Sequence, residues 1–520
     1  MSHGTSWILS KKSLKSIWPV ESSEISKFLP LFSIKLLISF IYTILFSVKD
    51  TVVVAHVGGS AEVIPALKGT LVVIFAFAVM LIYTKLSNVL SRDRLFYTVL
   101  YSFLVFFFVF GFILFPYREH FALDSIASSM KLVLGNNNSH WIYIVKYWMN
   151  SLFFVAAELW GGVIIALLFW GFINQISSIK EAAKFYTLYS LGGHCGSILA
   201  GLITMNISSL NSYSYDFILG ILMMMVVGVG IIVAMLYKYV TETILEGESL
   251  KDKTFVRNDK KSKLKLSVFD SLKYICTSPH LGWIALILIG YCISVNLVEV
   301  TWKAIIKIYY SDIKEYQRFL GIYQTVLGVS SIILALFFSG PILRSKGWLF
   351  SARLTPIVMA LTSGLFFCVY FYVGKDFLQG SHHMAVGTIP LFILVVIGAV
   401  HNISCKAMKY CVFDPTKEMA YIPLDLEGKV KGKAAVDLLG ARLGKSGSSW
   451  IHIILLFMVE SGSVFSIVGY LVPFLAVTIF FWMLATKNLD RSIKNKSANH
   501  TLGASNTDIN PIKSSGILTS

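Results

Sequence analysis

The sequence predicts an all-α membrane protein with twelve transmembrane helices arranged as two six-helix halves. Hydrophobic residues make up 56% of the 520-residue chain and charged residues only 14%, whereas soluble domains carry about 45–50% and about 25%. The mean hydropathy is +0.71. Because so few charges cannot cover a water-exposed surface of this size, a soluble multidomain protein is excluded.

Twelve stretches of about 20 mostly apolar residues, the length that crosses a bilayer, occur along the chain. Residues 28–238 contain the first six, at 28–47, 67–86, 95–115, 150–172, 185–207 and 216–238. Residues 281–486 contain the other six, at 281–301, 319–340, 349–373, 388–411, 438–459 and 465–486. A basic hydrophilic linker, 239–280, separates these halves. Residues 1–27 and 487–520 are polar tails, and the Ser-, Asn- and Lys-rich C-terminal tail is expected to be disordered.

The net charge of +17 is concentrated in particular connections between the spans. Most of the 45 Lys and Arg residues lie in the N-terminal tail, the even-numbered connections and the C-terminal tail. Cationic loops stay on the cytoplasmic side of a membrane, so both termini and the linker are expected to be cytoplasmic. Topology and contact with a lipid bilayer therefore account for the basic balance, and no nucleic-acid partner is expected.

Six spans, a long basic loop and six more spans form a major-facilitator-like plan, in which the substrate binds between the halves near the midplane of the membrane. The sequence contains no metal-ligand cluster, no zinc-like cysteine spacing and no nucleophile–base constellation. The chain is therefore expected to be a transporter rather than an enzyme, with no metal and no cofactor.

Ionisable residues inside membrane spans are costly and mark candidate functional sites. Glu158 lies deep in the fourth span, within FFVAAELWGGVIIALLF. The pair Lys49 and Asp50 follows the first span, where a lysine could instead extend to the membrane interface. Glu299 lies near the end of the seventh span, with Asn296 about one turn before it.

Two further spans each carry a pair of cations on one helix face, Lys406 with Lys409 and Arg442 with Lys445. The run GARLGKS is one residue too short for a phosphate-binding P-loop and follows no predicted strand, which excludes an ATPase loop. Lysine binds phosphate as a point charge. The residues thus predict a transporter for an anionic, phosphorylated solute. The acids could pair with the lysines when the site is empty, or could carry protons.

At these motifs the chain resembles the nucleotide translocases (ATP/ADP carriers) of rickettsiae, chlamydiae and plastids. The resemblance covers residues 17–487 and includes IWPVE, FSVKDTVVV, SAEVIPALK, YTKLSNVLS, AELWG, LLFWGFINQI, AAKFY, VNLVEVTWK, CVFDPTKEMAYIPLD, KVKGKAA and LGKSGS. Members of that family exchange ATP for ADP or import nucleotides with protons. They also resemble the twelve-span major-facilitator plan.

The resemblance implies roles for four charged residues. The family's essential lysines match Lys49 and Lys445, which are expected to meet phosphates, and its essential glutamates match Glu158 and Glu299. The glutamates are expected to pair with lysines during the transport cycle or to help recognise the substrate. The predicted substrate-binding residues are Lys49, Glu158, Glu299, Lys445, Lys406, His194, Asn296 and Arg442.

Two positions depart from the family pattern. Phe46 stands three residues before Lys49, where ATP/ADP exchangers have an arginine, and His194 follows two glycines where the family often has Gly-Ala-Asn. The site region thereby loses one cation and gains a group that titrates near neutral pH. A changed substrate, or proton coupling through His194 or a glutamate, is therefore an alternative to strict ATP/ADP exchange.

The resemblance implies a monomeric nucleotide transporter in the inner membrane of an obligate intracellular bacterium. Its substrates are expected to be nucleoside di- and triphosphates, moved by alternating access. Exchange of one nucleotide for another is the expected mode. Proton-coupled net import is the alternative, and protons or phosphate are the candidate coupling ions.

Overall fold

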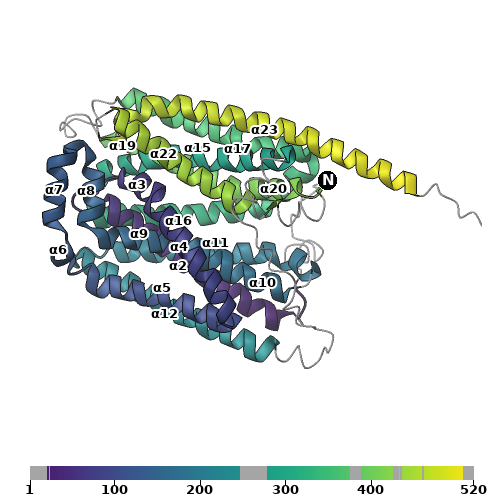
Figure 1. Ribbon diagram of the computed structural model, residues 1–520, viewed down its shortest axis with the longest axis horizontal. Coiled ribbons are helices and arrows are strands. Elements are labelled where there is room, and N and C mark those ends of the chain that lie inside the picture. The colour runs from purple at the N-terminus through teal and green to yellow at the C-terminus, as the bar shows by residue number, and fades with distance from the viewer. Residues whose placement is uncertain are drawn as a thin grey trace, which may run out of the picture.

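The computed structural model (Figure 1) describes residues 20–22, 24–177, 179–245, 278–374, 388–424, 432–433, 436–459 and 462–507. Within these ranges the secondary structure is helical and no strand occurs. This confirms the all-α class. Most of the predicted linker, residues 246–277, lies outside the described residues.

The first half of the chain begins with α2 and ends with the short π-helical turn η4. Its elements are α2 (Ile25–Val54), α3 (Val63–Gly69), α4 (Leu71–Val89), α5 (Arg92–Val109), η1 (Phe110–Leu114), α6 (Arg118–Phe121), α7 (Asp124–Leu134), α8 (Ser139–Lys146), α9 (Trp148–Trp160), η3 (Gly161–Phe169), α10 (Trp170–Ile176), α11 (Ile179–Ser208), α12 (Tyr215–Tyr239) and η4 (Val240–Leu245). Figure 1 shows α6, α7 and α8, which the sequence did not predict, at the end of the bundle where α2 finishes.

The second half of the chain begins with α15 and ends with the long helix α23. Its elements are α15 (Pro279–Tyr309), α16 (Ile313–Leu334), η5 (Ala335–Ser339), α17 (Gly340–Val373), α19 (Thr388–Met408), η6 (Lys409–Phe413), α20 (Asp414–Ala420), η8 (Val436–Gly440), α22 (Ala441–Val459) and α23 (Val464–Thr507). Figure 1 shows the two halves side by side, with most long helices running along the same direction.

Eleven of the described helical stretches are long and apolar enough to cross a membrane, and each overlaps one predicted span. The remaining predicted span, 438–459, corresponds to α22, whose first turns carry ARLGKSGSS and are therefore polar. The chain is a multi-pass membrane protein with the predicted helical architecture.

Helices α2 and α15 both continue well beyond the ends that the sequence predicted. α2 runs on from the predicted end at 47 to Val54, and α15 runs on from 301 to Tyr309. Hydropathy ends a span at a charged residue because it counts only the cost of the charge, whereas a paired charge can stay inside a helix. The alternative of Lys49 as a helix-end cation at the interface is wrong, since Lys49 lies inside α2 and is fully buried.

The prediction of a disordered tail from residue 487 onward is wrong for residues 487–507, which are helical. α23 continues without a break to Thr507. One helical turn apart in this extension, the Lys494 ammonium lies 2.7 Å from Asp490 Oδ2. Ion pairs with this spacing stabilise a solvent-exposed helix. Residues 508–520 lie outside the described residues.

The two halves meet at the end of the bundle where α2 and α15 finish, here called the distal end. There the Glu62 carboxylate accepts a hydrogen bond of 2.6 Å from the backbone N–H of Val464, at the start of α23. The Lys307 ammonium of α15 donates to the backbone carbonyl of Gly59, in the turn after α2. These hydrogen bonds join the halves at the distal end.

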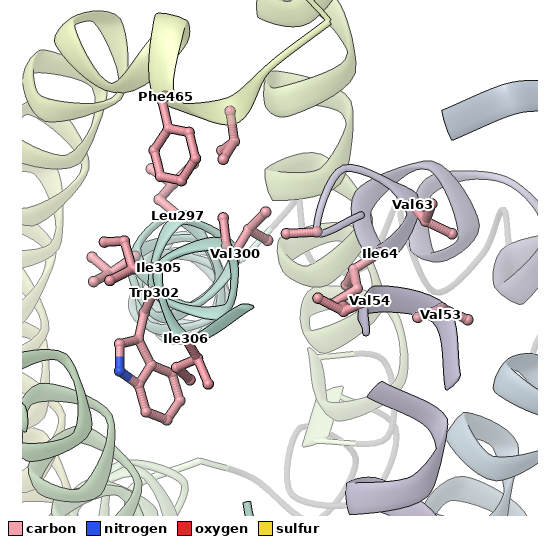
Figure 2. Packing of buried hydrophobic residues seen from close by; sticks show 14 of the residues in the cluster. Val53, Val54, Val63, Ile64, Leu297, Val300, Trp302, Ile305, Ile306 and Phe465 are labelled. Atoms are coloured by element: carbon pink, nitrogen blue, oxygen red, sulfur yellow. The ribbon is translucent and has the colours of Figure 1, made fainter. Parts of the chain in front are cut away.

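Helix α15 is the most deeply buried of the eleven candidate spans. Figure 2 shows its side chains directed to several sides, with Trp302 and the Phe465 ring of α23 on opposite sides of the helix. Val54 and Ile64 lie toward it from the first half. Because α15 packs against neighbours all around, any charge that it carries is removed from water and requires a partner.

Helices α11 and α16, one from each half, approach so closely that only glycine fits at their contact. A Cβ atom on Gly321 of α16 would lie 2.7 Å from the backbone nitrogen of Met205 in α11. A Cβ atom on Gly201 would lie 2.7 Å from the Gly321 carbonyl oxygen. Small residues allow such backbone contact between helices in membranes.

We expect Gly321→Ala to destabilise the protein by about 1–3 kcal/mol, the usual effect of overpacking, because the new methyl group meets backbone atoms that cannot move aside. The measurement is the apparent melting temperature of the purified protein in detergent. Gly228→Ala in α12 is the matched control, since a Cβ atom there would have no neighbour within 4 Å. Equal melting temperatures for the two variants would contradict the proposed close contact.

Candidate functional site

Seven charged side chains form one continuous chain of ion pairs where the two halves face each other. α2 contributes a lysine and an aspartate, α9 a glutamate, α15 a glutamate and a lysine, and α19 and α22 one lysine each. Lysines and carboxylates alternate along it. We call this set the charged network, and it consists of Lys445, Glu158, Lys49, Asp50, Lys303, Glu299 and Lys406.

The first part of the charged network is centred on Lys49. Its ammonium lies 3.0 Å from Asp50 Oδ1 and 3.3 Å from Glu158 Oε2. The other oxygen of Glu158 lies 3.7 Å from the Lys445 ammonium, on the opposite half. The pair between Glu158 and Lys445 therefore connects α9 with α22.

The second part of the charged network is centred on Glu299. Its Oε1 atom lies 3.1 Å from the ammonium of Lys303, one turn further along α15, and 3.1 Å from that of Lys406. Lys303 also lies 2.8 Å from Asp50 Oδ2. This pair between Asp50 and Lys303 connects α2 with α15, and therefore joins the two halves.

The exposure of these side chains increases from the middle of the charged network towards both ends, where Lys406 is 15% exposed and Lys445 is the most exposed. Asp50 is completely buried, and Lys49 and Lys303 are each 1% exposed, whereas Glu158 is 15% and Lys445 58% exposed. Lys445 lies in the second turn of α22, which begins at the end of the bundle opposite the distal end. The charged network therefore has an accessible side near Lys445 and a buried centre at the pair between Asp50 and Lys303.

The sequence matches a known transporter family over most of its length. A profile of the family described as TLC ATP/ADP transporter matches residues 7–493. The chain belongs to this TLC family. It is 38% identical over 492 residues to ADP,ATP carrier protein 1 of Chlamydia muridarum, covering 93% of this chain and 91% of that protein.

Relatives of this TLC protein occur in plastids and in rickettsiae. ADP,ATP carrier protein 1, chloroplastic, of Arabidopsis thaliana is 38% identical over 481 residues, covering 91% of this chain and 75% of the relative. ADP,ATP carrier protein 4 of Rickettsia felis is 35% identical over 490 residues, covering 92% and 94%. These are transporters, in agreement with the expectation that the chain is not an enzyme.

A solved structure supports the fold of this TLC protein. A bacterial homologue of the iron transporter ferroportin, in an inward-facing state, superposes with a TM-score of 0.55 at 14% identity, covering 91% of this chain and all of that chain. At this identity the likeness concerns the fold alone. It confirms the major-facilitator-like arrangement.

The structure brings five of the eight predicted site residues of this TLC protein directly into the charged network, namely Lys49, Glu158, Glu299, Lys406 and Lys445. A sixth, Asn296, lies three residues before Glu299 on the same helix, and its Oδ1 atom accepts a hydrogen bond of 3.2 Å from Lys68, at the end of α3. The acids and lysines that the sequence singled out are therefore paired with one another in the structure.

Two predicted site residues lie outside the charged network. The His194 ring in α11 packs edge-on against Tyr410 of the other half, with ring centroids 5.1 Å apart. Arg442 is exposed at the start of α22 and takes part in none of the ion pairs found among the described residues. Lys409, which shares a helix face with Lys406 in the sequence, pairs with Asp414 at 2.8 Å.

Sequence reasoning missed two lysines of this region, Lys303 and Lys68. Lys303 follows the predicted end of the seventh span and was treated as a loop cation, yet it is 1% exposed. Its spacing of four residues from Glu299 was the available signal, because such residues share a helix face. Lys68 had no comparable signal, since its partner Asn296 is 228 residues away.

The charged network consists of lysine and carboxylate side chains. No group of three or more His, Cys, Asp or Glu residues in the described part of the chain has the geometry to hold a metal ion. What the charged network offers to a ligand is a row of ammonium groups. Such groups bind anions, and phosphates in particular.

Proposed function

We propose that the chain exchanges ATP for ADP across the inner membrane of an intracellular bacterium by alternating access, with the nucleotide phosphates bound by lysines of the charged network. One observation carries this proposal. Each carboxylate of the charged network is shared between two lysines, and the row contains four lysines and three carboxylates. The names of the relatives from chlamydiae, plastids and rickettsiae support ATP and ADP as the substrates.

This arrangement of charges suits a ligand with several anionic groups. Carboxylate and phosphate oxygens both accept charge-assisted hydrogen bonds from ammonium groups. An incoming phosphate can therefore take the place of a carboxylate beside a lysine without leaving that lysine unpaired. A nucleotide with two or three phosphates can do so at several lysines of the row at once.

The same arrangement favours exchange over net transport. In the structure the pair between Asp50 and Lys303 joins the halves, as does the pair between Glu158 and Lys445. Alternating access requires the halves to move against each other. A carrier without nucleotide would reorient slowly, because these ion pairs hold its halves together. A bound nucleotide whose phosphates pair with the lysines would break these ion pairs and so allow the halves to move.

The proposal includes the orientation and the oligomeric state. The distribution of cations supports cytoplasmic termini, so the accessible side of the charged network near Lys445 would face the cytoplasm. The family resemblance is the basis for proposing a monomeric carrier. Protons and phosphate are not needed as coupling ions for exchange.

The test is uptake of labelled ATP into proteoliposomes, with and without ADP inside. We expect uptake only into vesicles that contain nucleotide, and no response to a proton ionophore. Uptake into empty vesicles that depends on a pH gradient would instead establish proton-coupled import. If no nucleotide enters in either arrangement, the proposed function is wrong.

We expect Lys445→Gln to raise the KM for ATP about tenfold while leaving the melting temperature nearly unchanged. Exposed ion pairs contribute little to stability, and Lys445 is 58% exposed at 3.7 Å from Glu158. A charge at the rim of a site mainly affects the capture of a charged ligand and its salt dependence. Transport kinetics at low and high salt measure the effect, and a KM equal to that of the unchanged protein at low salt would contradict it.

A further inference from the structure

The side chain of Phe46 lies among three lysines of the charged network. Its ring centroid is 4.7 Å from the ammonium of Lys49, 4.9 Å from that of Lys406 and 5.3 Å from that of Lys303. Lys49 belongs to α2, as does Phe46 itself, whereas Lys303 and Lys406 belong to the second half. One ring is therefore the common neighbour of cations from both halves.

Three ammonium groups so close together repel one another, and two of them belong to side chains that are removed from water, because Lys49 and Lys303 are each 1% exposed. The face of an aromatic ring carries partial negative charge and attracts cations, most strongly where water is excluded. An aliphatic side chain of similar size would fill the same space without this attraction. The chemistry of the ring, and not only its volume, therefore matters at this position.

The ring differs from the carboxylates in one respect that concerns transport. Asp50 and Glu299 neutralise Lys303 in the structure, and Glu299 also neutralises Lys406. In the proposed function, phosphates replace these carboxylates. Phe46 carries no charge and does not compete with phosphate for the ammonium groups, so it can remain beside them in both the empty and the loaded site.

We propose that Phe46 is a positioning residue that holds the ammonium groups of Lys49, Lys303 and Lys406 together as a binding site for a polyphosphate chain. This inference rests on the proposed function, and it identifies the part of the substrate that the site recognises. Each ammonium lies within 5.3 Å of the ring centroid. One polyphosphate chain can thus contact all three ammonium groups at once, whereas a single phosphate is too small to contact all three equally well.

The test compares Phe46→Leu with Phe46→Tyr in the full-length protein. The first probe is inorganic tripolyphosphate, whose affinity is measured by its stabilisation of the protein against heat. Phe46→Leu is expected to weaken this affinity about tenfold, which corresponds to about 1.4 kcal/mol, whereas Phe46→Tyr keeps the aromatic face and should stay within about twofold of the unchanged protein. The second readout is exchange, where Phe46→Leu should raise the KM for ATP with little change in kcat.

Phe40→Leu is the matched control, because Phe40 is a buried ring of the same helix with no cation–π contact among the described residues. It should alter stability without altering the affinity for tripolyphosphate. The inference is overturned if Phe46→Leu binds tripolyphosphate as tightly as the unchanged protein, or if the unchanged protein does not bind it. If tripolyphosphate binding depends on Phe46 but no nucleotide is exchanged, the proposed function fails while the role of Phe46 stands.

Discussion

Replacing Lys49 with glutamine is expected to weaken nucleotide binding at least about 100-fold and to abolish measurable exchange. Removing one partner of a buried, hydrogen-bonded charge pair costs about 2–5 kcal/mol or more of binding free energy, and about 1.4 kcal/mol corresponds to a factor of ten. Lys49 is fully buried between Asp50 and Glu158. Its loss removes a cation and leaves carboxylate charge that repels phosphate.

The affinity for ATP in detergent and the initial rate of exchange in proteoliposomes measure this effect. Lys238→Gln provides the control, because Lys238 is 65% exposed and its ion pair within the described part of the chain is a surface pair with Glu242 at 3.9 Å. A surface pair of this kind contributes little, so this variant should behave as the unchanged protein. An affinity of Lys49→Gln within threefold of that control would contradict the assignment of Lys49 to the binding site.

The double variant Lys49→Gln/Glu158→Gln separates binding from stability. Glu158 is 15% exposed and pairs with Lys49 at 3.3 Å and with Lys445 at 3.7 Å. When Lys49 is replaced, the longer of these two ion pairs remains. Neutralising it as well should restore part of the lost stability, because an unpaired buried charge is removed. Affinity for nucleotide should stay low, since the missing cation is not replaced.

The sequence alone predicted the fold well, because span-length apolar stretches have a direct physical meaning in a membrane. It also identified Glu158, Glu299 and Lys445, since an ionisable residue inside an apolar stretch is costly and conspicuous. It did not predict which residues pair. Ion pairs such as that between Asp50 and Lys303 join residues more than 250 positions apart, and no local pattern encodes that proximity.

The two departures from the family pattern show how position decides the importance of a residue. In the sequence, Phe46 was noted as a lost cation and His194 as a gained titrating group. In the structure, Phe46 lies among three ammonium groups, whereas His194 packs against Tyr410 outside the charged network. The chemistry of each side chain was known from the sequence, but its neighbours depend on helix packing between the halves.

Asp50→Asn is expected to destabilise the protein by about 3–5 kcal/mol, the range found when one partner of a buried ion pair is removed. Asp50 is completely buried and lies 3.0 Å from the Lys49 ammonium and 2.8 Å from that of Lys303. The change leaves Lys303 with Glu299 alone, which Lys406 already shares. It also breaks a link between the halves, so the apparent melting temperature should fall by several degrees.

Neutralising both partners distinguishes an ion pair from simple packing at this position. Asp50→Asn/Lys303→Gln leaves no unpaired charge in the contact between α2 and α15, so its melting temperature should lie above that of Asp50→Asn, a non-additive result typical of residues in direct contact. Glu242→Gln, at the 60% exposed partner of a surface pair, should have almost no effect. If the losses in melting temperature caused by Asp50→Asn and by Lys303→Gln simply added up in the double variant, the two side chains would not interact. If Asp50→Asn/Lys303→Gln recovered the melting temperature but did not exchange nucleotide, this buried ion pair would be required for transport rather than for stability. The reason is that a lysine can exchange its carboxylate partner for a phosphate, whereas a glutamine carries no charge to pair with either.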